Sequence, residues 1–218
     1  MWYIMDVEND AEIIVGFEND VIEEEYVSSL DNGKVLDILI SEKIDIGNTF
    51  YIPTGRVHAI GAGTVLAEIQ QTSDITYRIY DYDRVDVSTG VKRDLHTDLA
   101  LKAIDYKDYD DYRTKYNLKI NESSLLVHSP YFKTNIIQLN DNLAKDYLEL
   151  DSFVIYICVE GQLTLKTKNN HVNLVKGETI LVPASISNVE LVSKNAKLTE
   201  VYMQLNNIFC SFKIFSKF

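Results

Sequence analysis

The sequence predicts a mainly β protein that consists of two jelly-roll barrels with a small helical insertion and a helical connector. Apolar and polar residues alternate along many short segments, as they do in strands with one buried face. A turn motif also repeats, because Gly47-x5-Pro53 recurs as Gly177-x5-Pro183. Since the flanking apolar strands repeat too, the pattern indicates two related barrels. A chance match between two Gly/Pro turns is the alternative.

The first predicted domain, residues 1–93, is an incomplete barrel with an insertion at about 20–42. In the insertion, Asn19 or Asp20 would cap a helix over about 20–30, and residues 34–42 repeat a helix-like pattern. The predicted strands of this domain cover residues 2–7, 11–17, 48–52, 57–60, 64–70 and 75–80.

The second predicted segment, residues 94–122, is a helical connector. The apolar spacing predicts a helix over 94–104. Four tyrosines then follow near helical spacing, at Tyr106, Tyr109, Tyr112 and Tyr116. We expect an amphipathic connector that packs these rings on the barrels, and a ligand-binding stripe is the alternative.

The third predicted domain, residues 123–218, is a second barrel without metal ligands. Phe153 to Val159 is apolar on both alternating faces, which favours a fully buried strand, and Glu160-Gly161 is expected to turn the chain after it. Five residues past Pro183 stands Asn188, where the first copy of the repeat has a histidine.

Composition limits the partners. The net charge of -12 argues against nucleic acid and anionic membranes. No segment has the ~20 apolar residues of a membrane span, and the N-terminal residues lack the basic region of a signal peptide. We therefore expect a cytoplasmic protein, in which Cys158 and Cys210 are reduced core thiols.

One stretch carries the chemistry. Pro53-Thr54-Gly55 suits a tight turn, with proline second and glycine fourth if the turn is type I. His58 follows three residues later, where a second strand would begin. This spacing is what a small barrel needs to carry an imidazole on a rigid strand into its interior. A histidine satisfied by hydrogen bonds in the core is the alternative.

The stretch resembles a known family. Its Gly-x5-Pro-x-Gly-x2-His spacing is similar to the second metal-binding motif of the cupins. With the segment from Glu68 through Ser73-Asp74 to Arg78, it resembles class I mannose-6-phosphate isomerases in their short bacterial form. The resemblance implies a zinc enzyme that interconverts mannose 6-phosphate and fructose 6-phosphate through a metal-assisted enediol proton transfer.

The resemblance also implies residue roles. His58 would be a zinc ligand and Arg78 an active-site arginine. A structural ion pair of Arg78 with Asp74, Asp81 or Asp83 is the alternative. Glu68 is a second catalytic candidate, because Glu68, Gln70 and Thr72 alternate on one strand face. It would be either a catalytic or supporting carboxylate in the barrel or a buried hydrogen-bonded one. The candidate phosphate-binding residues are Arg84, Lys92 and Arg93.

Part of the family pattern is missing. The sequence contains no Gln-x-His-Pro segment, and the family's ligand glutamate would precede Met1. We therefore expect a chain that lacks the N-terminal part, is impaired alone, and exposes strand edges through which a homo-oligomer would form. A non-catalytic cupin that binds sugar phosphates, or a metal-dependent cupin oxygenase, are the alternatives.

Overall fold

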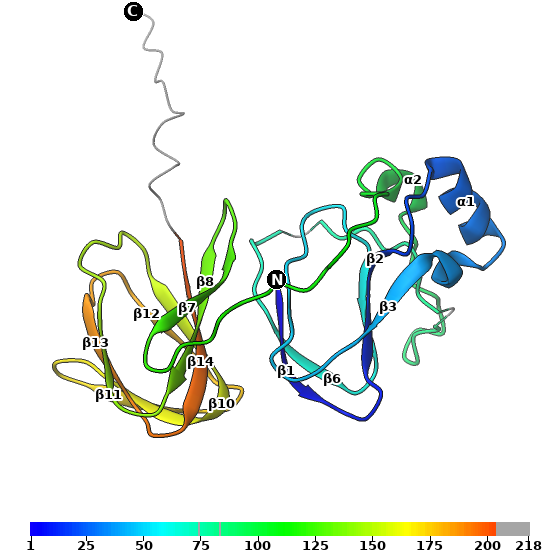
Figure 1. The fold of residues 1–218 in the computed structure, drawn as a ribbon. Helices are drawn as coiled ribbons and strands as arrows, with labels where there is room; N and C mark the ends of the chain where they lie inside the picture. The colour runs from blue at the N-terminus through cyan, green and yellow to red at the C-terminus, as the bar shows by residue number, and fades with distance from the viewer. Residues whose placement is uncertain (74, 83, 204–218) are drawn as a thin grey trace, which may run out of the picture. The chain divides into compact units, whose positions relative to one another are not determined.

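The computed structural model describes residues 1–73, 75–82 and 84–203, and the chain divides into two compact units, Met1–Arg113 and Thr114–Phe218 (Figure 1). Antiparallel strands dominate both units. The prediction of a mainly β protein is confirmed. No helix among the described residues is both long enough and apolar enough to cross a membrane.

The first unit contains two three-stranded antiparallel sheets. Its strands are β1 (Trp2–Val7), β2 (Glu12–Phe17), β3 (Leu39–Lys43), β4 (Thr49–Phe50), β5 (His58–Ile60) and β6 (Thr64–Glu68). In one sheet β1 lies between β4 and β6, and in the other β2 lies between β3 and β5. The two central strands supply buried residues such as Trp2, Ile4, Ile13 and Val15, because both faces of a central strand can be covered.

The helices of the first unit are shorter than the sequence predicts. Helix α1 (Glu23–Asp31) begins after Ile22, and Asp20 bonds elsewhere instead of capping it. Only Val35–Ile38 of the second predicted helix is helical, as a 3-10 turn (η1), and the chain then enters β3. The connector helix shrinks to α2 (Thr97–Ala100). Residues 39–43 instead pair with β2 as an antiparallel edge strand, so tertiary pairing overrides the helix-like pattern.

The second unit is an eight-stranded, strongly curled sheet (Figure 1). Its strands are β7 (Ser123–His128), β8 (Lys133–Leu139), β9 (Leu143–Asp146), β10 (Val154–Lys166), β11 (His171–Val175), β12 (Thr179–Val182), β13 (Asn188–Val192) and β14 (Ala196–Tyr202). The expected turn at Glu160-Gly161 is wrong. The chain continues as β10, with a register shift between Cys158 and Glu160 and a positive φ at Gly161.

The repeated glycines adopt the same conformation and make the same contacts. Gly47 has φ 91° and Gly177 has φ 92°. The amide of Gly47 donates to the carbonyl of Ile4 at 2.9 Å, and the amide of Gly177 donates to the carbonyl of Cys158 at 2.8 Å. The backbone geometry of the turn motif therefore repeats together with its sequence. Cys158 is buried as a free thiol, and Cys210 lies outside the described residues.

Candidate functional site

A tight turn fixes the start of the candidate site. The Arg56 amide donates to the Pro53 carbonyl at 3.2 Å, so Gly55 is the third residue of the turn and not the fourth. Its φ of 92° is the positive value that a type II turn requires at this place. A Cβ at Gly55 would lie 2.4 Å from the Ala103 carbonyl oxygen. Glycine is therefore needed here for two independent reasons.

His58 is the first residue of β5, where it pairs with Val15 of β2. Its Nδ1 lies 2.7 Å from the Arg56 carbonyl oxygen. A carbonyl only accepts hydrogen bonds, so Nδ1 carries the proton and Nε2 of the neutral ring has the lone pair. The side chain is exposed. The alternative of a histidine buried in the core is therefore wrong.

Trp2 connects His58 to Glu68. The indole ring meets the imidazole edge-on, with ring centroids 5.3 Å apart and an interplanar angle of 77°. Trp2 is 2% exposed, and its Nε1 donates to Glu68 Oε1 at 3.1 Å. Glu68 ends β6 and is exposed, so it is not a buried carboxylate. Two of the three predicted site residues thus contact one buried ring.

Arg78 lies in a different local setting. The predicted strand over 75–80 is absent from its described residues. The Arg78 amide donates to His96 Nδ1 at 3.0 Å, and Arg78 Nη1 donates to the Asp94 carbonyl at 3.2 Å. No hydrogen bond or ion pair joins Arg78 to His58 or Glu68 within the described residues. Arg78 is therefore held by the segment around Asp94 and His96 and not by direct bonds to the other two residues.

Two candidate phosphate-binding arginines converge on one carboxylate. Arg84 Nη2 lies 2.8 Å from Asp81 Oδ1, and Arg93 Nε donates to Asp81 Oδ2 at 2.9 Å. The hydrogen bond from Arg93, with help from Arg84, holds the pKa of Asp81 below its usual value. Asp81 is thus paired with these arginines and not with Arg78. Asp74 and Asp83, the other expected partners of Arg78, lie outside the described residues.

The donors do not complete a metal centre. No group of three or more His, Cys, Asp or Glu side chains in the described ranges gathers closely enough to hold a metal ion. His58 offers one nitrogen, in the tautomer that metal-bound histidines commonly adopt. Structural and catalytic zinc sites have at least three protein ligands. The residues described therefore do not gather the three protein ligands of a whole zinc site.

Sequence reasoning missed two residues around His58, namely Trp2 and Arg56. Trp2 is the only tryptophan of the chain and precedes a run of apolar residues, a pattern typical of any buried strand. Arg56 stands at a variable place in the turn motif, and the partners of its side chain are about fifty residues away. No local signal in the sequence could have identified either one.

Comparisons with known proteins find relatives of this chain. Residues 121–203 match the family model of the mannose-6-phosphate isomerase cupin domain. The chain is 31% identical over 192 residues to mannose-6-phosphate isomerase ManA of Bacillus subtilis (strain 168), covering 87% of this chain and 60% of that protein. It is also 31% identical over 186 residues to the mannose-6-phosphate isomerase of Streptococcus mutans, covering 85% of this chain and 58% of that protein.

A solved structure shows the same fold. The crystal structure of the mannose 6-phosphate isomerase from Bacillus subtilis superposes with a TM-score of 0.81 at 30% identity, covering 92% of this chain and 63% of that one. The chain spans about 60% of the length of the curated relatives named above. Together, the family match over residues 121–203, the two relatives and the shared cupin-like fold support a member of the mannose-6-phosphate isomerase cupin family.

Proposed function

We propose that this protein serves the interconversion of mannose 6-phosphate and fructose 6-phosphate, as an aldose–ketose isomerase. The observation that carries the proposal is His58, which lies on the family's motif with its Nδ1 bonded and its Nε2 available, beside Trp2 and Glu68. The relatives that share 31% of its residues are named for this reaction.

The reaction moves a proton between C1 and C2 of the sugar through an enediol. It requires a base near the C–H bond and a positive group near the developing oxyanion. Glu68 is our candidate base, because Trp2 holds its Oε1 and the carboxylate is exposed. Arg78 is our candidate for the oxyanion, and the phosphate group would be held by basic residues such as Arg84, Lys92 and Arg93.

We propose zinc as the metal of the complete family site, with His58 as one ligand. Because the described residues do not gather a full set of ligands, we expect this 218-residue chain to be impaired alone. The test is the formation of fructose 6-phosphate from mannose 6-phosphate, with and without added zinc, for the wild type and for His58→Ala. We expect weak turnover that zinc stimulates and His58→Ala abolishes. Zinc-independent turnover that survives His58→Ala would contradict the assignment.

The second candidate function is a non-catalytic cupin that binds sugar phosphates. The lack of a group of three or more metal ligands among the described residues favours it. Calorimetric titration with mannose 6-phosphate, and with mannose as the control, separates the two. Binding of the phosphorylated sugar without zinc and without turnover supports this candidate, whereas neither binding nor turnover eliminates both. Bound iron on metal analysis would instead point to the oxygenase alternative.

We further propose that both units are jelly-roll barrels related by the repeat, with limits near 1–93, 94–122 and 123–218. The matching φ angles and amide bonds of Gly47 and Gly177 support this relation. We also propose a cytoplasmic protein that forms homo-oligomers through edge strands such as β6, where Val65 is 56% exposed. Light scattering after size exclusion tests the oligomer, and a monomeric mass at high concentration refutes it.

A further inference from the structure

Arg56 packs against the rings of Tyr109 and Tyr112, which meet each other at 70°, and with Asp105 these residues form a clamp on its side chain. Its guanidinium carbon lies 4.3 Å from the ring centroid of Tyr109 and 4.8 Å from that of Tyr112. Arg56 Nη2 also lies 3.8 Å from Asp105 Oδ2, and the side chain is only 11% exposed. A planar guanidinium suits such a place, because it can stack on aromatic faces and bind a carboxylate at the same time.

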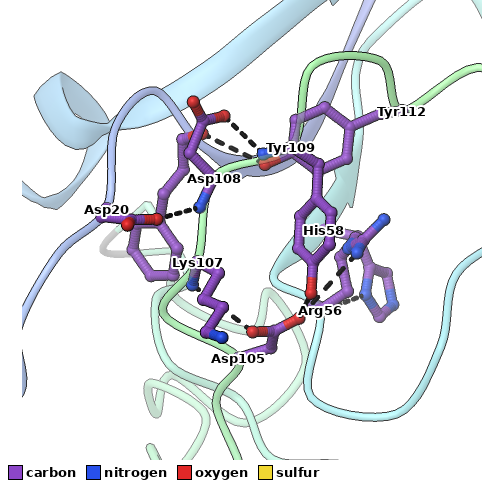
Figure 2. Close-up of polar contacts among 9 residues, drawn as sticks. Asp20, Arg56, His58, Asp105, Lys107, Asp108, Tyr109 and Tyr112 are labelled. Carbon is purple, nitrogen blue, oxygen red and sulfur yellow. Dashed lines mark hydrogen bonds and ion pairs between the residues drawn. The ribbon is translucent and has the colours of Figure 1, made fainter.

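The clamp is itself held in place. Tyr109 OH donates to Asp105 Oδ2 at 2.8 Å, which joins two of the groups that contact Arg56. Tyr112 is 5% exposed, and its hydroxyl donates to the Phe17 carbonyl at 3.2 Å. Figure 2 shows the hydroxyl of Tyr109 directed at Asp105, with Arg56 and His58 side by side. The tyrosine-rich segment thus packs on this arginine as an irregular chain and not as the predicted helix.

The clamp reaches His58 through the backbone. The Asp105 amide donates to the Gly55 carbonyl at 2.9 Å. The backbone of the clamp is therefore bonded to the turn at the residue directly before Arg56. The carbonyl of Arg56 accepts the proton of His58 Nδ1. The side chain of Arg56 and the carbonyl of the preceding Gly55 are both held. The Arg56 carbonyl therefore has little freedom to rotate away from His58. The orientation of the acceptor selects the tautomer of the imidazole.

We propose that Arg56 is a positioning residue for His58, and that Tyr109, Tyr112 and Asp105 hold it for that purpose. Its stacked guanidinium fixes the carbonyl that keeps the proton on Nδ1 and leaves the Nε2 lone pair available. The benefit of this tautomer for catalysis rests on the proposed function. The positioning of the His58 proton by Arg56 does not. It gives a role in the site to the tyrosine-rich segment.

The test measures the tautomer directly, without sugar or metal. Long-range proton–nitrogen spectra of the labelled chain are recorded at about pH 8, above the ordinary histidine pKa of about 6.5. His58→Gln assigns the ring signals. We expect the Nδ1-protonated form to dominate in the wild type, and Arg56→Lys to raise the Nε2-protonated population about threefold or more, because lysine keeps the charge but cannot stack.

Two further variants complete the design. Arg113→Lys is the matched control, since Arg113 binds Glu42 and the Lys43 carbonyl and, among the described residues, forms no hydrogen bond or ion pair with the turn. It should leave the tautomer unchanged. Tyr109→Leu removes one face of the clamp from a side chain that is 41% exposed, and it replaces Arg56→Lys if that variant fails to fold. It should shift the tautomer in the same direction.

Amide exchange separates positioning from mere support. The amide of Arg56 bonds within the turn, that of Asp105 bonds the Gly55 carbonyl, and that of Gly16 bonds the Val57 carbonyl just after the turn. In Arg56→Lys these three amides should exchange about tenfold faster. Faster exchange with an unchanged tautomer means that Arg56 only supports the fold, and it overturns the proposal. An unchanged tautomer in Tyr109→Leu overturns it as well. Because no substrate is present, a failure of the isomerase assignment would not alter these readouts.

Discussion

At the scale of residues, the candidate site depends on one indole. Trp2 is buried in the middle strand of its sheet, and it presents its edge to His58 and its N–H to Glu68. Two exposed polar side chains are thereby attached to a ring that cannot move without disturbing the core. A buried ring can in this way hold exposed groups in a defined geometry.

The bond between Trp2 and Glu68 gives a prediction with its own control. Glu68→Leu leaves the buried indole N–H without an acceptor and should destabilise the first unit by about 1 kcal/mol. Glu68→Gln keeps a carbonyl acceptor and should cost much less. Because Trp2 is the only tryptophan, denaturation followed by its fluorescence reports on this unit. Equal losses in the two variants would show that the hydrogen bond contributes nothing.

At the scale of elements, strand β14 carries a buried carboxylate with four donors. Glu200 is 1% exposed, and its Oε1 lies 2.8 Å from Lys145 Nζ and also accepts from Tyr147 OH. Its Oε2 accepts from Ser123 Oγ and Asn135 Nδ2, both at 2.7 Å. Burial alone would raise the pKa of Glu200, but Lys145 and the hydrogen bonds outweigh it and hold the pKa below its usual value.

A depressed carboxyl pKa makes stability depend on pH with a definite sign. The contribution of Glu200 is complete above its unfolded pKa of about 4.3, and it is lost as the pH falls through that value toward the lower folded pKa. Acid unfolding of the second unit, followed by circular dichroism, should therefore become less steep in Glu200→Gln. At neutral pH the same variant should cost about 3 kcal/mol, because Lys145 is left unpaired.

A second Lys–Glu pair in the same unit supplies the control. Glu160 and Lys197 are also 2.8 Å apart, but Glu160 is 51% exposed. Glu160→Gln should therefore change the stability by less than about 1 kcal/mol and leave the acid limb unaltered. If both variants lose the same amount, burial is not what makes the Glu200 network important.

At the scale of the whole molecule, each unit has a hydrophobic core of its own. The core of the second unit draws residues from β8, β10, β11, β12, β13 and β14. The first unit has separate clusters around Trp2 and around Phe17. A unit with its own core can fold without the rest of the chain.

Residues 114–218 made alone should therefore unfold in one cooperative thermal transition, measured by circular dichroism. Within this fragment, Leu198→Ala should lower the midpoint sharply, since Leu198 is fully buried and its loss costs about 2–5 kcal/mol. Leu181→Ala should have little effect, because Leu181 is 54% exposed. A broad, non-cooperative transition would show that the second unit depends on the first.

The sequence by itself indicated most of the strands, the family resemblance and the turn before His58, because periodicity, a repeated turn and a motif are all local or evenly spaced patterns. It misjudged Glu160-Gly161 and residues 34–42, where pairing with a neighbouring strand overrode the local preference. Only the tertiary structure decided that Trp2 joins His58 to Glu68, that Arg78 bonds to Asp94 and His96, and that Arg56 packs against Tyr109 and Tyr112. These contacts join residues far apart in the chain, and no local pattern encodes which distant side chains the fold will bring together.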